Sequence, residues 1–395
     1  MRPFSVSRVQ FPSAFSYGTP AEVVFGNGTA RSVGERVVPL GAQSVLLIAD
    51  HGVVQAGLTE GIQRSLDAAG IPWELFADIR GEPTDVSVQA AVDAAAASSA
   101  NAVVAIGGGS ALDTAKAAAV ISSNGGTVLE YLHRERQVTR PGIPVVVIPT
   151  TSGTGAEVTP LSVIIDTGRQ YKGGVSGTHM MPRLAICDPE LTLGLPALVT
   201  ANTGIDALTH CIECYANTVF HPFAKLTALE GIRVLGANVR RAVAHGGDLA
   251  TRWEMMWGAH LGGLCIARAG TGDVHAFAGP LSGMFGVLHG RANAILLPHV
   301  MEFSLPGAID AYADVAAALD EPVSGLTRLA AAERAVAAVR RLVTDCGGQQ
   351  KLSEFGVREE HLEVLTRDGF GRGNRATNPR IATRDDVMAI YRAAI

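Results

Sequence analysis

The sequence predicts an α/β domain followed by an all-helical domain. Three observations support this fold class. Short apolar runs alternate with Ala-rich helical stretches through the first half of the chain, and this alternation is typical of a parallel sheet covered on both faces. Helical periodicity dominates after about residue 195. The length of 395 residues fits two hydrophobic cores. We therefore expect domains over residues 1–195 and 196–395.

Within the first half, apolar runs rich in β-branched residues predict the strands of the sheet. An Ala-rich segment between the first two, residues 85–100, predicts a helix. The predicted strands are SVLLIAD (44–50), NAVVAIGGG (101–109), IPVVVIPT (143–150) and LSVIID (161–166).

The second half begins with Pro196, in PALVTANTGIDALTHCIECYAN, where the helical pattern starts. Residues 226–245 and 326–346 have the apolar stripe of amphipathic helices. Nothing in this half indicates a strand, so we expect helices alone.

Composition narrows the class of function. The formal net charge is -5 without a basic block, which argues against nucleic acid as a partner. No apolar run reaches the roughly 18–20 residues of a membrane span, and the N-terminus lacks the apolar segment of a signal peptide. The five cysteines are scattered and odd in number, so we expect reduced thiols and a cytoplasmic location.

A glycine turn joins a predicted strand to a predicted helix in AVVAIGGGSALDTAKAAAV (102–120). Gly107, Gly108 and Gly109 permit close backbone approach, and Ser110 with the following amides opens a helix N-terminus that favours a phosphate. The spacing is neither G-x-G-x-x-G nor that of a P-loop. A tight turn without a ligand is therefore an equal alternative for this loop taken alone.

Two further loops favour a dinucleotide. Asp50 ends the first predicted strand, where an acid can accept hydrogen bonds from ribose hydroxyls, although it could instead cap the next helix. The loop IPTTSGTGAEVTP (148–160) is rich in hydroxyl groups, although these could be solvated or cap backbone amides. Its candidate contacts are Thr150, Thr151, Ser152, Thr154 and Thr159. Loops after parallel strands converge at one sheet edge, so together they indicate a cofactor such as NAD.

Four side chains of the helical half suggest a metal centre. Asp206 and His210 are four residues apart, on one face of a predicted helix, and His275 and His289 follow in apolar or glycine-rich surroundings. One carboxylate and three imidazoles suit a divalent first-row metal, Fe(II) or Zn(II). An internal Asp206–His210 ion pair is an equal alternative. The Cys211-x-x-Cys214 spacing is interpreted as small core residues rather than a redox or zinc motif.

Several long segments, in order, resemble the iron-containing (group III) alcohol dehydrogenase family over nearly the whole chain. This resemblance implies a dinucleotide-binding α/β domain and a helical domain, the fold shared with dehydroquinate synthase. The segments are GGGSALDTAK (107–116), PTTSGTGAEVTPLSVI (149–164), DPELTLGLP (188–196), TGIDALTHCIE (203–213) and LHGRANAILLPHV (288–300).

The resemblance also implies residue roles and an activity. It implies hydride transfer between NAD(H) and a small alcohol or aldehyde held at a metal, with Fe(II) ahead of Zn(II), in a homodimer or larger homo-oligomer. Asp50 would disfavour NADP and Lys172 would lie near the nicotinamide ribose. The implied metal ligands and catalytic residues are Asp206, His210, His275 and His289; the implied cofactor contacts are Gly108, Gly109, Ser110, Thr150, Thr151 and Thr159.

The sequence departs from the family pattern at three places. Gly279 stands where many members have a second histidine, four residues after His275, that is credited with proton relay. Arg268 replaces a neutral amide near the expected metal, and Glu82 replaces an asparagine near the adenosine. From Arg268 and Gly279 we expect a small substrate that carries an anionic group. Alternatively, Arg268 points away and pairs with Asp273 or another acid.

Three other functions remain open at this stage. The same fold supports an NAD- and metal-dependent lyase or cyclase like dehydroquinate synthase. A metal-free reductase resembling maleylacetate reductases is disfavoured by Asp206, because those relatives tend to have asparagine there. A catalytically silent protein that binds NAD and metal is suggested by the missing histidine at Gly279.

Overall fold

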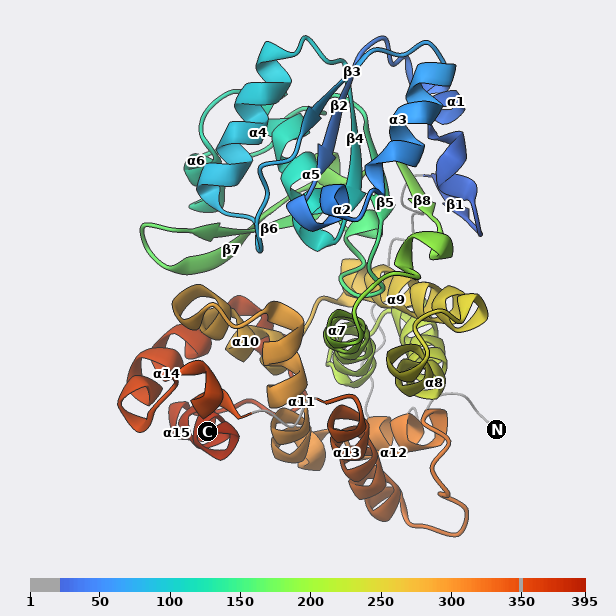
Figure 1. The fold of residues 1–395 in the computed structure, drawn as a ribbon. Helices are drawn as coiled ribbons and strands as arrows, with labels where there is room; N and C mark the ends of the chain where they lie inside the picture. Colours follow the sequence, from blue (N-terminus) through green and yellow to red (C-terminus); the bar gives the residue numbers. More distant parts are fainter. Residues whose placement is uncertain (1–21, 348–350) are drawn as a thin grey trace. The chain divides into compact units, whose positions relative to one another are not determined.

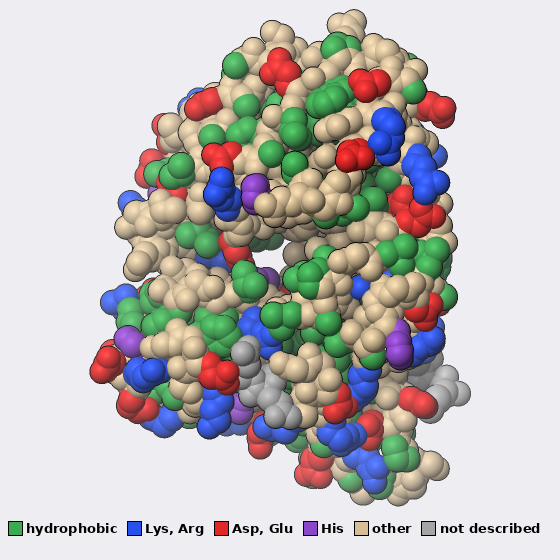
Figure 2. Space-filling view, viewed as in Figure 1, with side chains coloured by type: hydrophobic (Ala, Val, Ile, Leu, Met, Phe, Trp, Pro, Cys, Tyr) green, Lys and Arg blue, Asp and Glu red, His purple; other side chains and the backbone are tan. Residues whose placement is uncertain are grey.

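The computed structural model describes residues 22–347 and 351–395. These residues divide into two compact units, one ending at Leu195 and the other beginning at Pro196. The predicted assignment of residues 1–21 to the first domain lies outside the described residues. Among the described residues, no helix has the length and apolarity to cross a membrane. Acidic and basic side chains are interspersed on the face drawn in Figure 2.

The first unit contains a six-stranded parallel sheet in the order β1-β8-β5-β4-β2-β3, together with a separate antiparallel pair, β6 and β7 (Figure 1). The strands are β1 (Glu22–Phe25), β2 (Val45–Ala49), β3 (Trp73–Phe76), β4 (Ala102–Gly107), β5 (Val145–Pro149), β6 (Leu161–Asp166), β7 (Tyr171–Ser176) and β8 (Leu184–Cys187). The helices are α1 (Val33–Val37), α2 (His51–Gln55), α3 (Thr59–Ala68), α4 (Asp85–Ala97), α5 (Gly109–Asn124) and α6 (Val128–Leu132).

Alternation along the central strands explains why both faces of this sheet are covered. In β2, Leu46 and Ile48 pack in one apolar cluster with α4 and α5, whereas Val45 and Leu47 pack in another with α1 and α3. Successive strand residues point to opposite faces, so a wholly apolar strand needs helices on both. β2, β4 and β5 are buried along their whole length.

The strand predicted at residues 161–166 forms, but it does not join the parallel sheet. β6 pairs with β7, from Leu161 opposite Ser176 to Asp166 opposite Tyr171, and otherwise forms one isolated parallel bridge, between Ile165 and Thr84, among the described residues. Its burial alternates along the chain, as expected for a two-stranded ribbon with one covered face. The prediction of a strand was correct, and its place in the parallel sheet was wrong.

The second unit is helical throughout its described residues. α7 contributes to a buried apolar core together with most of the following helices, so the helical pattern after Pro196 reflects real core packing. The helices are α7 (Ala197–Ala216), α8 (Pro222–Ala244), α9 (Leu249–Ala269), α10 (Asp273–Phe285), α11 (His289–Ser304), α12 (Ile309–Ala318), α13 (Arg328–Asp345), α14 (Leu362–Phe370) and α15 (Arg384–Ala394).

Candidate active site

The glycine loop of the first unit lies at the point where the strand order reverses. β2 and β4 are neighbours, but the chain visits β3 on one side before it returns to β4 on the other. Ligands bind at such a switch point in open α/β sheets, outside the carboxyl ends of the strands. Gly108 is the N-cap of the 16-residue helix α5, and Ser110 lies in its first turn. The backbone amides there can face an anion.

Close packing around this loop explains the glycines. A Cβ atom at Gly107 would lie 2.6 Å from the Asp50 carboxylate, and one at Gly109 would lie 2.7 Å from the Thr154 methyl group. The Thr150 amide donates to the Gly107 carbonyl at 2.9 Å. Three loops predicted to converge therefore do so within this unit, and the backbone at Gly107 and Gly109 lies too close to Asp50 and Thr154 for any side chain. Backbone amides at the start of α5, next to these loops, fit the pyrophosphate of a dinucleotide.

Asp50 fulfils the alternative that the sequence left open. Its carboxylate accepts from the Val53 amide at 2.9 Å and caps α2. The same carboxylate also lies against Gly107, at the adjacent strand end. A capping role leaves the second oxygen at the switch point, so the cap and a ribose contact are compatible.

Lys116, within the glycine-loop motif, has a structural task that the sequence analysis missed. Its side chain is fully buried, and its ammonium lies 2.8 Å from the Asp113 carboxylate. It also donates to the carbonyls of Ala156 at 3.0 Å and Thr159 at 3.3 Å, and to that of Leu161. These contacts tie the hydroxyl-rich loop to α5. The signal was the Asp-x-x-Lys spacing, which places both charges on one helix face.

Lys172 lies on β7, outside the parallel sheet, and is buried. It forms an ion pair with Glu82, the residue that departs from the family's asparagine. The departure at Glu82 is therefore coupled to Lys172, which the resemblance places near the ribose. Any contact of Lys172 with a ribose would be made by a lysine that also holds a carboxylate.

In the second unit, one face of α7 carries Asp206, His210 and Glu213. These residues follow one another at spacings of four and three, which aligns them along the helix. His275 in the first turn of α10 and His289 at the start of α11 complete the group. All four predicted metal ligands are thus in one place, and Glu213 joins them as a residue that the sequence analysis left without a role.

The four side chains form a compact donor set. Oδ1 of Asp206 lies 3.8 Å from Nε2 of His275 and 3.8 Å from Nε2 of His289. The ligand atoms of Asp206, His210 and His275 all lie within 4.8 Å of one another, and the His210 and His275 rings are stacked at 4.7 Å. A tetrahedral ion with bonds of about 2.0–2.2 Å holds its donors about 3.3–3.6 Å apart. The donor set therefore fits a divalent metal after small side-chain movements.

Electrostatics keep the Asp206 carboxyl ionised. Burial raises its pKa, but the neighbouring imidazoles of His210, His289 and His275, with a hydrogen bond from Asn293, outweigh burial and lower the pKa to about 2. An ionised carboxylate is the form that binds a metal. Buried acids are otherwise rarely charged without a partner.

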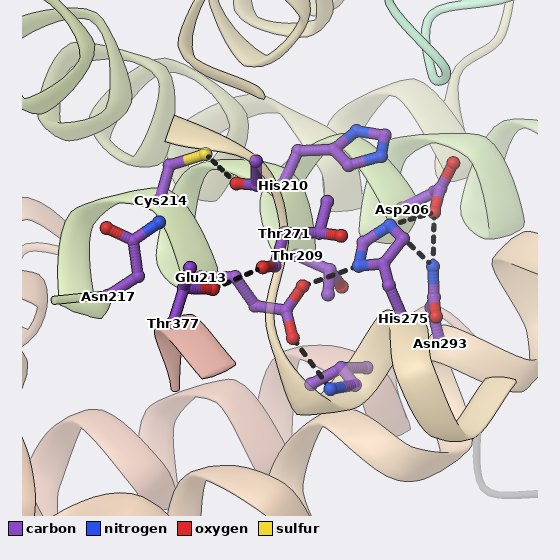
Figure 3. A network of polar contacts seen from close by, with 12 residues as sticks. Asp206, Thr209, His210, Glu213, Cys214, Asn217, Thr271, His275, Asn293 and Thr377 are labelled. Carbon is purple, nitrogen blue, oxygen red and sulfur yellow. Dashed lines mark hydrogen bonds and ion pairs between the residues drawn. The ribbon is translucent and has the colours of Figure 1, made fainter. Parts of the chain in front are cut away.

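Glu213 fixes the orientation of His275 (Figure 3). One carboxylate oxygen lies 2.5 Å from Nδ1 of His275, and the other accepts from the Val274 amide at 2.6 Å. With Nδ1 donating to Glu213, Nε2 presents its lone pair toward Asp206. A carboxylate behind a ligating histidine is the usual support in metal sites.

Asn293 is a second residue without a predicted role. Its side chain is fully buried, and Nδ2 lies 2.6 Å from Asp206 Oδ1. The same nitrogen is 3.2 Å from Nε2 of His275 and 3.3 Å from Nε2 of His289. It lies four positions after His289 on α11, and this spacing was the signal that could have found it.

Two of the departures from the family pattern, Arg268 and Gly279, lie on different helices of the second unit. Arg268 lies in the last turn of α9 and is partly buried. Gly279 is in the middle of α10, where the guanidinium of Arg372 lies against it. Asp273, proposed as a partner of Arg268, has Arg375 at 3.6 Å.

All five cysteines are buried and free of disulfides. Cys214 donates from its thiol to the Gly270 carbonyl at 2.9 Å, and burial raises its pKa well above the usual range. A protonated, buried thiol is a poor metal ligand and nucleophile. Cys211 and Cys214 are thus core residues, as their interpretation from the sequence proposed.

Comparison with known proteins gives one consistent result. A family model described as "Iron-containing alcohol dehydrogenase" matches residues 20–189, and one described as "Fe-containing alcohol dehydrogenase family, C-terminal" matches residues 200–395. Together they span nearly the whole chain.

Full-length relatives agree. The chain is 35% identical to an NAD-dependent methanol dehydrogenase of Bacillus methanolicus, over 95% of this chain and 98% of the relative. It is 34% identical to a sulfoacetaldehyde reductase of Bilophila wadsworthia, over 96% and 99%. A crystal structure of 1,3-propanediol oxidoreductase matches with a TM-score of 0.93 and 34% identity, covering 97% of this chain and 100% of that one.

Proposed function

This chain belongs to the iron-containing alcohol dehydrogenase family, and from that premise we propose how its own residues support NAD-linked interconversion of small alcohols and aldehydes. The observation that carries the proposal is the buried donor set around Asp206, in which Glu213 holds one of three imidazoles. A shared cation would offset the cost of burying the Asp206 carboxylate, and carboxylate and imidazole groups are suitable ligands for it.

The metal ligands would be Asp206, His210, His275 and His289. When bound, a divalent ion polarises the oxygen of the alcohol or aldehyde, while the nicotinamide accepts or supplies the hydride. Asp206 supplies the negative charge of the ligand set, and Glu213 keeps the Nδ1 proton of His275. We expect Fe(II) as the resident metal, because the chain belongs to the iron-containing family. Zn(II) is the alternative, since imidazole and carboxylate ligands suit both ions.

The cofactor would lie across the glycine loop, with its pyrophosphate at Gly108, Gly109 and Ser110. Asp50 would accept from ribose hydroxyls and repel a 2′-phosphate, which favours NAD over NADP. Lys116 would act indirectly, by holding the hydroxyl-rich loop in place. Thr150, Thr151, Thr154, Thr159 and Lys172 are proposed as further contacts.

The substrate would be a small alcohol or aldehyde. The narrower form of this proposal is a substrate that also carries an anionic group. The Bilophila relative is named for an aldehyde that carries a sulfonate. The sequence alone suggested Arg268 as the residue that meets such a group. A homodimer or larger homo-oligomer is proposed by resemblance to the family.

The experiment compares the protein with Asp206→Asn and with a surface control, Asp345→Asn. Asp345 pairs with Arg240 on the surface, so its loss should leave metal binding intact. We expect Asp206→Asn to lose at least about 100-fold in metal affinity and to lose aldehyde-dependent NADH oxidation. Free NAD+ should form in proportion to alcohol. Bound metal with retained turnover in Asp206→Asn would contradict the proposed site, and a product formed without net NADH oxidation would favour a lyase.

A further inference from the structure

Gly279 leaves a space on α10 that Arg372 fills. A Cβ atom at Gly279 would lie 2.6 Å from Nη1 of Arg372, 2.7 Å from Cζ and 3.1 Å from Nε. The guanidinium group therefore covers the position where any other residue would begin its side chain. Arg372 follows α14, so this contact joins segments far apart in the chain.

The position of this guanidinium follows from helix geometry. Gly279 is four residues after His275 on α10, so the two share a helix face, with Cβ positions about 5–6 Å apart. His275 directs Nε2 toward Asp206, as its Nδ1 faces Glu213. Arg372 consequently brings a positive charge to within one helical turn of a proposed metal ligand.

Packing holds the segment that carries Arg372 against α10. A Cβ atom at Gly369 would lie 2.8 Å from the Tyr391 hydroxyl and 3.2 Å from the Phe277 ring. Tyr391 itself donates to the Phe277 carbonyl at 2.8 Å. Because Gly369 has no side chain, the end of α14 can pack closely against Tyr391 and Phe277. This packing fixes the backbone from which the Arg372 side chain extends.

The nearby Arg375 has a different environment. It donates to the carbonyls of Phe370 at 2.7 Å and Ala382 at 2.6 Å, and its Nε lies 3.6 Å from Asp273. These contacts explain Arg375 as a structural residue. Arg372 is distinguished by its place over a glycine on the face of a metal ligand.

Resting on the function proposed above, we propose that Arg372 binds the anionic group of a short aldehyde or alcohol that ends in a carboxylate, sulfonate or phosphonate. A guanidinium pairs with such groups through two parallel hydrogen bonds. A divalent cation held by His275 would be repelled by the guanidinium that packs one turn further along α10, and an anionic substituent on the substrate would offset that repulsion. Arg372 is thus a specificity-determining residue, and Gly279 is the residue that gives it room.

The test uses the metal-loaded protein and a pair of substrates of similar length, 4-oxobutanoate and butanal. The variants are Arg372→Gln, which removes the charge, and Gly279→Ala, whose methyl group displaces the guanidinium end without removing it. Arg367→Gln is the matched control, because Arg367 is exposed and pairs with Asp368 at 2.9 Å. Arg268→Gln tests the arginine proposed from sequence.

We expect Arg372→Gln to lower kcat/KM for 4-oxobutanoate by about 10–100-fold, mainly through KM, with a loss for butanal at least about tenfold smaller. Gly279→Ala should change selectivity in the same direction, and Arg367→Gln should leave both substrates unaffected. Calorimetric binding of succinate to the protein with NADH provides a readout without turnover. Its Kd should rise by a similar factor in Arg372→Gln.

Three results would overturn the assignment. Equal losses for both substrates in Arg372→Gln would indicate a structural role. Unchanged succinate binding in both Arg372→Gln and Gly279→Ala would remove the anion site, and selective loss only in Arg268→Gln would move it to that residue. Failure of the wild type to oxidise NADH with either aldehyde would instead count against the proposed function, while succinate binding would still test Arg372.

Discussion

The carboxylate of Glu213 lies 2.5 Å from Nδ1 of His275, and this contact joins the helices α7 and α10 at the donor set. The other oxygen of Glu213 accepts from the Val274 backbone amide, at the N-terminus of α10. One side chain therefore fixes both the helix that carries His275 and the ring orientation of this histidine. The arrangement assigns Glu213 a supporting role that needs no contact with substrate.

Replacing Glu213 with glutamine should weaken metal binding by about 10–100-fold, because the neutral amide accepts more weakly from the imidazole. If the glutamine oxygen stays on the Val274 amide, the fold should persist, but its NH2 group then faces Nδ1 of His275 and cannot accept from it. Metal affinity is measured by competition with a chromophoric chelator. Glu230→Gln, at an exposed residue that pairs with Arg233, is the control. Equal affinities for Glu213→Gln and the wild type would remove Glu213 from the site.

Asn293→Ala should also weaken metal binding, by about tenfold, because Asp206 loses the amide that holds its Oδ1. The loss should be visible in calorimetric titration of the metal-free protein with Zn(II). Asn238→Ala is a matched control, since Asn238 is also a buried helical asparagine but donates to the Val234 carbonyl. A similar change in both variants would show a general effect of cavity formation.

Lys116→Met should lower the free energy of unfolding by about 3–5 kcal/mol, because it leaves the Asp113 carboxylate and several buried carbonyls without their cation. The hydroxyl-rich loop should also loosen, so the Kd for NADH should rise. Urea unfolding and NADH fluorescence measure the two effects. The double variant Asp113→Asn/Lys116→Met should recover part of the stability. A loss below about 1 kcal/mol would mean that Lys116 does not anchor the loop.

The partly buried His299 should make the free energy of unfolding depend on pH. Burial lowers its pKa below the ordinary value of 6.5, and the nearby Arg340 adds to this effect while Glu302 opposes it. The unfolded chain therefore binds the proton more readily, so stability is full above pH 6.5 and falls as the pH drops below it. His299→Asn should show a shallower fall between pH 6.5 and about pH 5. Unfolding at several pH values measures this, with exposed His51→Asn as control, and an unchanged slope would exclude His299.

The sequence alone predicted those elements whose residues follow one another within a single strand or helix. The buried strands β2, β4 and β5 are continuous apolar runs, and the spacing of Asp206 and His210 follows from one helix. The place of β6 was not predicted, because its hairpin partner β7 begins only five positions after β6 ends and its sequence, YKGGVS, has no strong strand pattern.

The supporting residues were missed for a related reason. Glu213 and Asn293 lie inside the family-like segments 203–213 and 288–300, but only tertiary packing shows which atoms they touch. The position of Arg372 was even less predictable, because nothing in the sequence connects it with Gly279, about ninety positions earlier. The missing side chain was visible from sequence, and what fills its place was not.

The most direct test of the central claim, a shared cation at Asp206, is metal reconstitution. Metal-free protein would be supplied in turn with Fe(II), Zn(II) or no metal, and NADH oxidation would be followed at 340 nm with 4-oxobutanoate and butanal, alongside bound metal per chain. The account predicts one metal ion per chain, lost in Asp206→Asn, and turnover only when that ion is present. Turnover at full rate by protein that holds no metal, or metal bound equally well by Asp206→Asn, would contradict it.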